Sequence, residues 1–389
     1  MGFVAYFAID VMSQLKQIVC VASAFVALAT CVNVEALAAT LTAQAHAIYQ
    51  GHAIEPHKAR GNSGDAEGDK RDALMPARSM ADFQNKAKIL PRNAAAEVHH
   101  ESTLWRAAFA GGVLLLLVYV GYVAALAIFQ RRFVFNPAHA NCPAAEPADT
   151  HEITRVRLAS ARNKAIKGWL LRPRQGKAPY PAIIYYGGRS EEVSWLQGAV
   201  RWFPNHAVLA LNYRGYGESE GEPSEEGLFQ DGLAQFDWLA AQPDIDPRTI
   251  VLVGRSLGTG VASYVAANRP AERVVLITPY DSLLAVASRH FWFAPLALLL
   301  RHKFKSVDYA RTNKQPCLAL LAEHDDIVPE EHTRRLMAAW AGAKKLVRIP
   351  STNHLDIPYQ AATLAAVAIW LGYASVPSGP LSLVVARAT

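Results

Sequence analysis

Short apolar runs alternate with longer amphipathic stretches between about Glu152 and Tyr373. Runs of this length predict strands, and the intervening stretches predict helices. We predict strands over residues 182–186, 207–212, 250–253, 273–277, 317–322 and 346–349, with helices notably over 226–241, 261–268 and 361–371. Strands buried on both faces of a parallel sheet are continuously apolar, as residues 250–253 are. The pattern therefore predicts one α/β domain with a mostly parallel sheet flanked by helices.

A longer apolar run lies ahead of this domain. Residues 107–129 carry no charged side chain, and as a helix they would extend roughly 34 Å, enough to cross a hydrocarbon core of about 30 Å. Trp105 and Arg106 precede the run, and Arg131 and Arg132 follow it, as is typical where a span meets lipid headgroups. We therefore predict a transmembrane helix over residues 104–130 in preference to a buried core helix.

The remaining segments complete the predicted organisation. Residues 1–50 contain an apolar run that is typical either of a secretory signal peptide or of a first membrane helix. Residues 51–103 are rich in polar residues and predict a flexible linker, residues 131–375 the α/β domain, and residues 376–389 a C-terminal tail. The protein is accordingly expected to cross the membrane once, or twice if the first segment is retained. Basic residues on the two sides of the main span do not differ enough to orient it.

The amino-acid composition and net charge limit which binding partners are expected. The 389 residues are 51% hydrophobic and 19% charged, which excludes a disordered chain. The net charge of +6 favours anionic lipid headgroups, but the basic residues form no dense block, so no nucleic-acid partner is expected. The four cysteines lie far apart without C-x-x-C spacing, so neither a metal site nor a disulfide framework is predicted. The sequence gives no indication of oligomeric state.

A G-x-S-x-G pattern follows the predicted strand 250–253. It runs from Gly254 through Arg255, Ser256 and Leu257 to Gly258, and a predicted helix comes after it. A tight strand-to-helix turn strains the central residue and leaves room only for glycine at the flanking positions. The turn raises the serine hydroxyl above the sheet at a helix N-terminus, where negative charge is favoured. We predict Ser256 as a nucleophile.

A serine nucleophile needs a base and an acid that orients the base. Asp325 follows the predicted strand 317–322, and His354 follows the strand 346–349, which is the order of partners after a G-x-S-x-G serine. We predict Asp325 as the acid, with Asp326 as its alternative. We predict His354 as the base in preference to His324, because His324 adjoins the acid instead of arriving one strand later.

An acyl-transfer site also needs two backbone donors for the oxyanion. The first predicted donor is the amide of Leu257, the residue after the nucleophile. The second should come from the loop after strand 182–186, which begins Gly187-Gly188-Arg189. We predict the Arg189 amide, with Gly188 as the alternative.

Several segments together resemble a known family, the membrane-anchored α/β-hydrolases described as serine aminopeptidase-like or α/β-hydrolase-domain proteins. The resemblance covers residues 130–370, and its segments are Gln130 to Phe133, Phe135-Asn136-Pro137, Asn212 to Gly217, Gly254 to Gly258, Asp325 to Pro329 and Asn353-His354. It implies the α/β-hydrolase fold with Ser256, Asp325 and His354 as the catalytic triad. Two positions depart from the family: its His-Gly-Asn loop is Gly187-Gly188-Arg189 here, and its glycine before the acid is Ala322.

The predicted function is hydrolysis of a carboxylic ester or thioester, with no metal or organic cofactor. A short helical lid is expected between Pro279 and Val307, where aromatic and leucine side chains lie among basic ones. Such a segment can receive an acyl chain, rest on a bilayer or simply pack on the sheet. The alternatives are a serine peptidase acting on short peptides and a non-catalytic membrane scaffold on a hydrolase fold.

Overall fold

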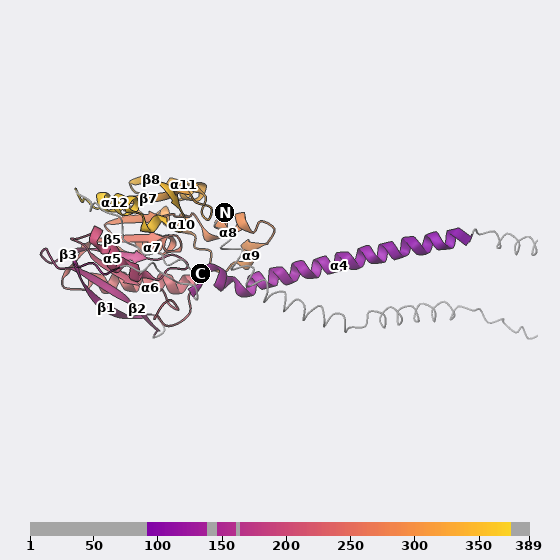
Figure 1. Ribbon diagram of the computed structural model, residues 1–389, viewed down its shortest axis with the longest axis horizontal. Coiled ribbons are helices and arrows are strands. Elements are labelled where there is room, and N and C mark those ends of the chain that lie inside the picture. The colour runs from indigo at the N-terminus through magenta and orange to yellow at the C-terminus, as the bar shows by residue number, and fades with distance from the viewer. Residues whose placement is uncertain (1–91, 138–145, 161–163, 375–389) are drawn as a thin grey trace, which may run out of the picture. The chain divides into compact units, whose positions relative to one another are not determined.

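The computed structural model describes residues 92–137, 146–160 and 164–374 (Figure 1). The predicted first apolar segment, most of the linker and the predicted C-terminal tail lie outside these residues. The chain divides into two compact units between Ala124 and Ala125. We refer to the described residues from Ala125 onward as the sheet unit.

Helix α4 (Arg92–Val134) carries the long apolar run. Within the described part of the chain, Phe109–Val134 is the one helical segment long and apolar enough to cross a membrane. The helix is longer than the predicted span 104–130 at both ends. Proline disfavours helical geometry at the residue before it, and none occurs between Pro91 and Pro137. The helix ends as the chain reaches Asn136, which has a positive φ of 46°.

In the described residues, eight strands form one sheet in the order β1-β2-β4-β3-β5-β6-β7-β8. The strands are β1 (His151–Ser160), β2 (Lys164–Pro173), β3 (Tyr180–Tyr186), β4 (Ala207–Leu211), β5 (Ile245–Arg255), β6 (Arg273–Ile277), β7 (Cys317–His324) and β8 (Lys344–Asn353). The six strands from β3 to β8 are mutually parallel. The predicted α/β fold with a mostly parallel sheet is therefore confirmed.

The β1–β2 hairpin is absent from the predicted strands. It pairs antiparallel through ten residues of each strand, and β2 then pairs antiparallel with β4. Strand β1 lies at the sheet edge and exposes Arg155 and Arg157, which form ion pairs with Glu218 and Glu220. Alternating charged and apolar residues are typical of an edge strand with one solvated face, unlike the continuously apolar inner strands.

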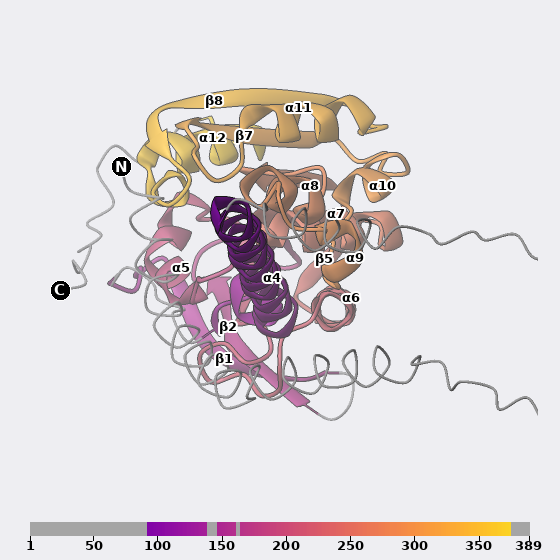
Figure 2. The same ribbon diagram turned by 90° about the vertical axis from the view of Figure 1, so that its right-hand side faces the viewer.

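Helices cover both faces of the sheet, as Figure 2 shows for α5 on one side and α6 and α7 on the other. One core packs beneath α6, α7, α10 and α11, and the other beneath η3, α5, η4, η5 and α12. The helices of the sheet unit are η3 (Val193–Trp195), α5 (Leu196–Ala199), η4 (Val200–Trp202), α6 (Glu225–Ala240), α7 (Leu257–Asn268), α8 (Leu283–His290), α9 (Leu296–Leu299), α10 (Ser306–Ala310), α11 (Glu330–Ala339), η5 (Ile357–Tyr359) and α12 (Ala361–Trp370).

After β3 the chain adds β4 on one side of it and then crosses over to add β5 on the other side, so that β3 lies between β4 and β5. The chain continues from the carboxyl end of β3 into η3 and α5 on one face of the sheet, and from that of β5 into α7 on the other face. The residues after β3 are the glycine loop, and those after β5 are the G-x-S-x-G turn. The topology thus brings the two predicted halves of the site to one point.

Candidate active site

Ser256 lies in a strained turn between β5 and α7. Its φ of 48° and ψ of −114° are unusual for a residue with a side chain, and such a conformation costs about 1–3 kcal/mol. A Cβ on Gly254 would lie 2.5 Å from the Gly258 carbonyl oxygen, and one on Gly258 would lie 2.1 Å from that of Tyr186. Both flanking positions therefore require glycine, because α7 packs directly against the ends of β5 and β3.

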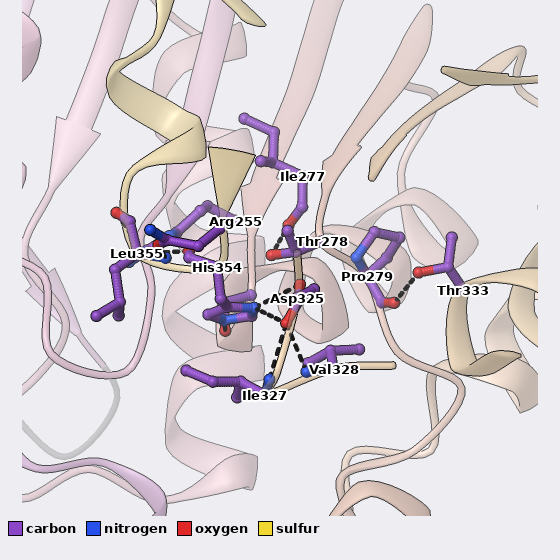
Figure 3. A network of polar contacts seen from close by, with 12 residues as sticks. Arg255, Ile277, Thr278, Pro279, Asp325, Ile327, Val328, Thr333, His354 and Leu355 are labelled. Atoms are coloured by element: carbon purple, nitrogen blue, oxygen red, sulfur yellow. Dashed lines mark hydrogen bonds and ion pairs between the residues drawn. The ribbon is translucent and has the colours of Figure 1, made fainter. Parts of the chain in front are cut away.

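Ser256, His354 and Asp325 come together from three separate strand ends. The Nε2 atom of His354 lies 2.8 Å from Oγ of Ser256, and its Nδ1 atom lies 2.8 Å from Oδ2 of Asp325. Figure 3 shows the His354 ring directed at Asp325, whose Oδ1 accepts hydrogen bonds from the amides of Ile327 and Val328 at 3.0 and 2.7 Å. These contacts form a continuous serine–imidazole–carboxylate chain.

The competing residues lie elsewhere. Asp326 is exposed, and the structure places Asp325, not Asp326, against His354. His324 is also exposed, and its Nε2 atom lies 3.7 Å from Glu323. Of the sequence alternatives, His354 contacts Ser256 directly, and Asp325 contacts His354.

Electrostatics keep the Asp325 carboxyl ionised. Burial raises its pKa, but the adjacent His354 ring and the amides of Val328 and Ile327 lower it by more, so the pKa lies below its ordinary value. A carboxylate in this position can fix one imidazole tautomer, with the proton on Nδ1 and the Nε2 lone pair directed at the serine.

The loop after β3 faces this chain. The hydroxyl of Tyr213 donates to the Gly187 carbonyl at 2.9 Å, and that of Tyr216 donates to the Arg189 carbonyl at 2.6 Å. These two side chains from the segment after β4 thus order the loop after β3. The amide of Gly188 donates to Oε2 of Glu191 at 2.7 Å. That amide is therefore committed within the loop, which leaves Arg189 as the candidate second oxyanion donor beside Leu257.

Sequence reasoning assigned no role to Glu191, which proves to be buried beside the site. Its carboxylate meets the Arg255 guanidinium at 3.1 Å, and both side chains are almost fully enclosed. The residue before the nucleophile thus points away from the Ser256 hydroxyl, into an ion pair. The only signal in the sequence was that Glu191 follows the Gly187-Gly188 pair by three residues. This pattern does not indicate which residue pairs with the carboxylate.

The predicted lid segment contains α8, α9 and the start of α10. Trp292 and Phe293 lie between α8 and α9 and are 82% and 42% exposed. Leu298, within α9, is 87% exposed. Leu296 and Leu300 are buried instead. The segment therefore packs on the sheet unit with some of its apolar side chains and presents others outward.

Among the residues with described side chains, no group of three or more His, Cys, Asp or Glu residues has the arrangement of a metal site. Cys317 is a buried thiol in β7, and burial raises its pKa. The other three cysteines lie outside the described residues.

Comparison with known proteins agrees with this architecture. The model of the alpha/beta hydrolase family matches residues 188–314. An uncharacterized protein of Mycobacterium tuberculosis (strain CDC 1551 / Oshkosh) is 32% identical over 249 residues, which are 62% of this chain and 86% of that protein. A lysophosphatidylserine lipase of Xenopus tropicalis is 29% identical over 194 residues, 43% of this chain and 48% of that protein.

Among solved structures, an acetyl xylan esterase from Paenibacillus sp. R4 matches with a TM-score of 0.50 at 18% identity, over 59% of this chain and 86% of that one. At this identity the match concerns the fold alone. The sheet order, the strained serine turn, the family model and the mycobacterial relative lead to one conclusion: the chain belongs to the α/β-hydrolase family.

Proposed function

We propose that this protein is a serine hydrolase that cleaves a carboxylic ester or thioester, with Ser256 as nucleophile, His354 as general base and Asp325 as the orienting acid. The observation that carries the proposal is the pair of 2.8 Å contacts through the two nitrogens of His354. A general base must lie within hydrogen-bond distance of the proton that it takes, and His354 does.

The reaction proceeds in two halves. Oγ of Ser256 attacks the carbonyl carbon as its proton passes to Nε2 of His354, and a tetrahedral oxyanion forms. His354 then gives that proton to the leaving alcohol or thiol, which leaves an acyl-serine. In the second half His354 deprotonates water, the resulting hydroxide attacks the acyl carbon, and the acid product departs as the proton returns to Ser256.

Backbone donors stabilise the oxyanion. Leu257 is the first residue of α7, and the amides of a helix's first turn lack acceptors within the helix. Its N–H is the first proposed donor, and the Arg189 N–H is the second. Removing a single donor of this kind costs about 100- to 1,000-fold in turnover in other hydrolases.

The proposed location is a membrane, with residues 104–130 as the span and the bilayer as a partner. Gln130, near the end of α4, donates to the Leu299 carbonyl at 3.2 Å and accepts from the Arg301 amide at 2.8 Å. These hydrogen bonds fix the lid segment to the end of the proposed span. Exposed Trp292 and Leu298 would then lie at headgroup depth, where aromatic and aliphatic side chains favour the boundary between water and acyl chains.

The lid supports an acyl or lipid ester as substrate, and so does the similarity to a lysophosphatidylserine lipase. The primary test is a panel of p-nitrophenyl esters and aminoacyl anilides with the full-length protein and its Ser256→Ala variant. We expect ester turnover that Ser256→Ala abolishes without loss of fold. Anilide cleavage with no ester cleavage would favour a peptidase, and unchanged turnover in the variant would exclude Ser256 as nucleophile.

A second experiment tests the membrane-facing lid. Leu298→Ser should lower turnover of long-chain esters embedded in phosphatidylglycerol-containing vesicles and leave turnover of a soluble acetyl ester unchanged. Ile369→Ser is the matched control, because Ile369 is an equally apolar side chain, 59% exposed on α12. Equal effects of the two substitutions, or hydrolysis of acetyl esters alone by the wild type, would contradict the lipid-facing role.

A further inference from the structure

Beside the proposed triad lies a buried ion pair that the reaction itself does not use. Glu191 has no exposed side-chain surface, and the Arg255 side chain is 8% exposed. Withdrawing two charges from water is costly unless each finds several partners. The partners of these two side chains show how the pair is stabilised and which segments it connects.

Each carboxylate oxygen of Glu191 accepts two hydrogen bonds. Oε1 accepts from the Tyr185 hydroxyl at 2.7 Å and from the Trp195 indole at 2.8 Å. Oε2 accepts from the Gly188 amide at 2.7 Å and from the Arg255 guanidinium at 3.1 Å. Burial and the Glu191 contact push the Tyr185 pKa well above its ordinary value, so its hydroxyl remains a donor. The carboxylate is thus fixed by side chains of the core, and it in turn fixes one amide of the glycine loop.

Arg255 extends the connection to the histidine loop. Its Nη2 atom donates to the His354 carbonyl at 3.0 Å and to the Leu355 carbonyl at 3.3 Å, and Figure 3 shows the Arg255 side chain lying against this part of the chain. Arg255 is also bonded through the backbone to Ser256. One residue therefore connects the loop that carries the base to the strand end that carries the nucleophile.

The glycine loop is shaped to admit this guanidinium. A Cβ on Gly188 would lie 2.5 Å from Nη1 of Arg255 and 3.2 Å from Oε2 of Glu191. The absence of a side chain at Gly188 thus allows the ion pair to pass directly beneath the loop backbone. The hydrogen bond from the Gly188 amide to Glu191 also fixes the peptide plane between Gly187 and Gly188, which is adjacent to the plane that carries the Arg189 amide.

We infer that Glu191 and Arg255 are positioning residues. They hold the oxyanion loop, the nucleophile turn and the histidine loop in the relative positions that catalysis requires. The inference rests on the proposed hydrolase function, since it assigns a role within that site. Neither side chain touches Oγ of Ser256 or the His354 ring in the contacts of the described residues. Their effect therefore comes through the backbone segments that they connect.

The experiment compares Glu191→Gln, Arg255→Met and the double variant in the full-length protein, with a p-nitrophenyl ester as substrate. The final extent of labelling by a fluorophosphonate probe counts intact sites, so kcat is expressed per labelled serine. We expect each single variant to lower kcat by about 10- to 100-fold with KM changed less than about threefold, because displaced donors and nucleophile weaken binding of the transition state more than of the substrate. The double variant should be no more than about threefold worse than the poorer single variant, since the two residues act as one unit.

Asp244→Asn is the matched control. Its carboxylate meets Arg172 at 2.6 Å, half-buried, just ahead of β5 and therefore at the opposite edge of the sheet from Ser256. This variant should keep its kcat per labelled site within about twofold. Arg255→Lys provides a milder change, because it keeps a charge beside Glu191 but lacks the second nitrogen for the His354 and Leu355 carbonyls. It should lower kcat by at least about fivefold even where Glu191→Gln does not accumulate.

Two results would overturn the inference alone: full kcat per labelled site in both Glu191→Gln and Arg255→Lys, or a double-variant effect equal to the product of the single effects. An equal loss in Asp244→Asn would show a general loss of stability in place of positioning and would also overturn it. If the wild type neither turns over esters nor takes the probe on Ser256, the proposed function fails first and this inference with it.

Discussion

Two aspartate–histidine pairs lie in the sheet unit. His354 contacts Asp325 through Nδ1 at 2.8 Å, and His332 contacts Asp281 through Nδ1 at the same distance. Both pairs are buried, and in both the carboxyl pKa is lowered below its ordinary value by contacts that outweigh burial. By these measures the pairs are equivalent.

Their surroundings differ. Nε2 of His354 meets Ser256, which is held in a strained turn. The Asp281 pair instead includes Arg335, whose Nε atom lies 2.6 Å from Oδ2 of Asp281 and whose Nη2 atom lies 2.8 Å from Nδ1 of His332. Asp281 also accepts from the Ser282 amide at the start of α8, so this pair secures the base of the lid. A paired carboxylate with a depressed pKa therefore does not define an active site, whereas a nucleophile in contact with the imidazole does.

The largest expected effect separates the two histidines. His354→Gln should lower kcat by about 10⁴-fold or more, because no other group described near Ser256 can take its proton. His332→Gln should leave kcat within about threefold. Steady-state ester hydrolysis by the two purified variants measures the difference, and comparable losses would place both pairs in the reaction.

The acids should differ by a smaller factor. Asp325→Asn keeps the shape of the side chain but loses the charge that fixes the imidazole tautomer, so kcat should fall by about 10³- to 10⁴-fold. Asp281→Asn, matched in chemistry and burial, should lower kcat less than about threefold. A modest effect of Asp325→Asn, below about tenfold, would contradict the assignment of the acid.

For stability we expect the opposite order, with a larger loss for Asp281→Asn than for Asp325→Asn. Asp281→Asn leaves Arg335 and His332 without their carboxylate and should lower the free energy of unfolding by about 1–3 kcal/mol. Asp325→Asn should cost less, because residues of a reactive site are seldom placed for stability. Denaturant unfolding of both variants tests this order, and a larger loss for Asp325→Asn would refute it.

The smallest effect concerns pH. The Asp281 pKa is lowered in the folded state, so its ionised form favours folding. That contribution is complete above the unfolded value near pH 4 and is lost as pH falls through the lower folded value. The stability difference between wild type and Asp281→Asn should therefore be constant above about pH 5 and shrink below about pH 4. A stability difference that grows as the pH falls would contradict the predicted direction of the pH dependence.

Much of this structure follows from local sequence signals. The six parallel strands were predicted from short apolar runs, and the buried strands among them are continuously apolar, as residues 250–253 are. Ser256, Asp325 and His354 could be named because each comes directly after one of these strands, and carboxyl ends of parallel strands share an edge. The β1–β2 hairpin was missed because its strands form no continuous apolar run. Charges such as Arg155 and Arg157 alternate with apolar residues there, and they are paired only once the loop after β4 is in place.

The polar interactions between distant segments could not be predicted in this way. Glu191 and Arg255 are separated by 64 positions, and Asp281 and His332 by 51. Neither residue type nor spacing indicates these pairings, because they depend on how two loops pack after the sheet has formed. A side chain at position 188 would collide with Arg255, and this reason for a glycine there can be recognised only from the structure.

The most direct test of the central claim is to locate the adduct of a fluorophosphonate probe by peptide mass spectrometry in the full-length protein and in His354→Gln. We expect one adduct, on Ser256, formed rapidly in the wild type and at least about 100-fold more slowly in the variant. An adduct on another residue, or equal labelling rates in the two proteins, would contradict the claim that His354 activates Ser256.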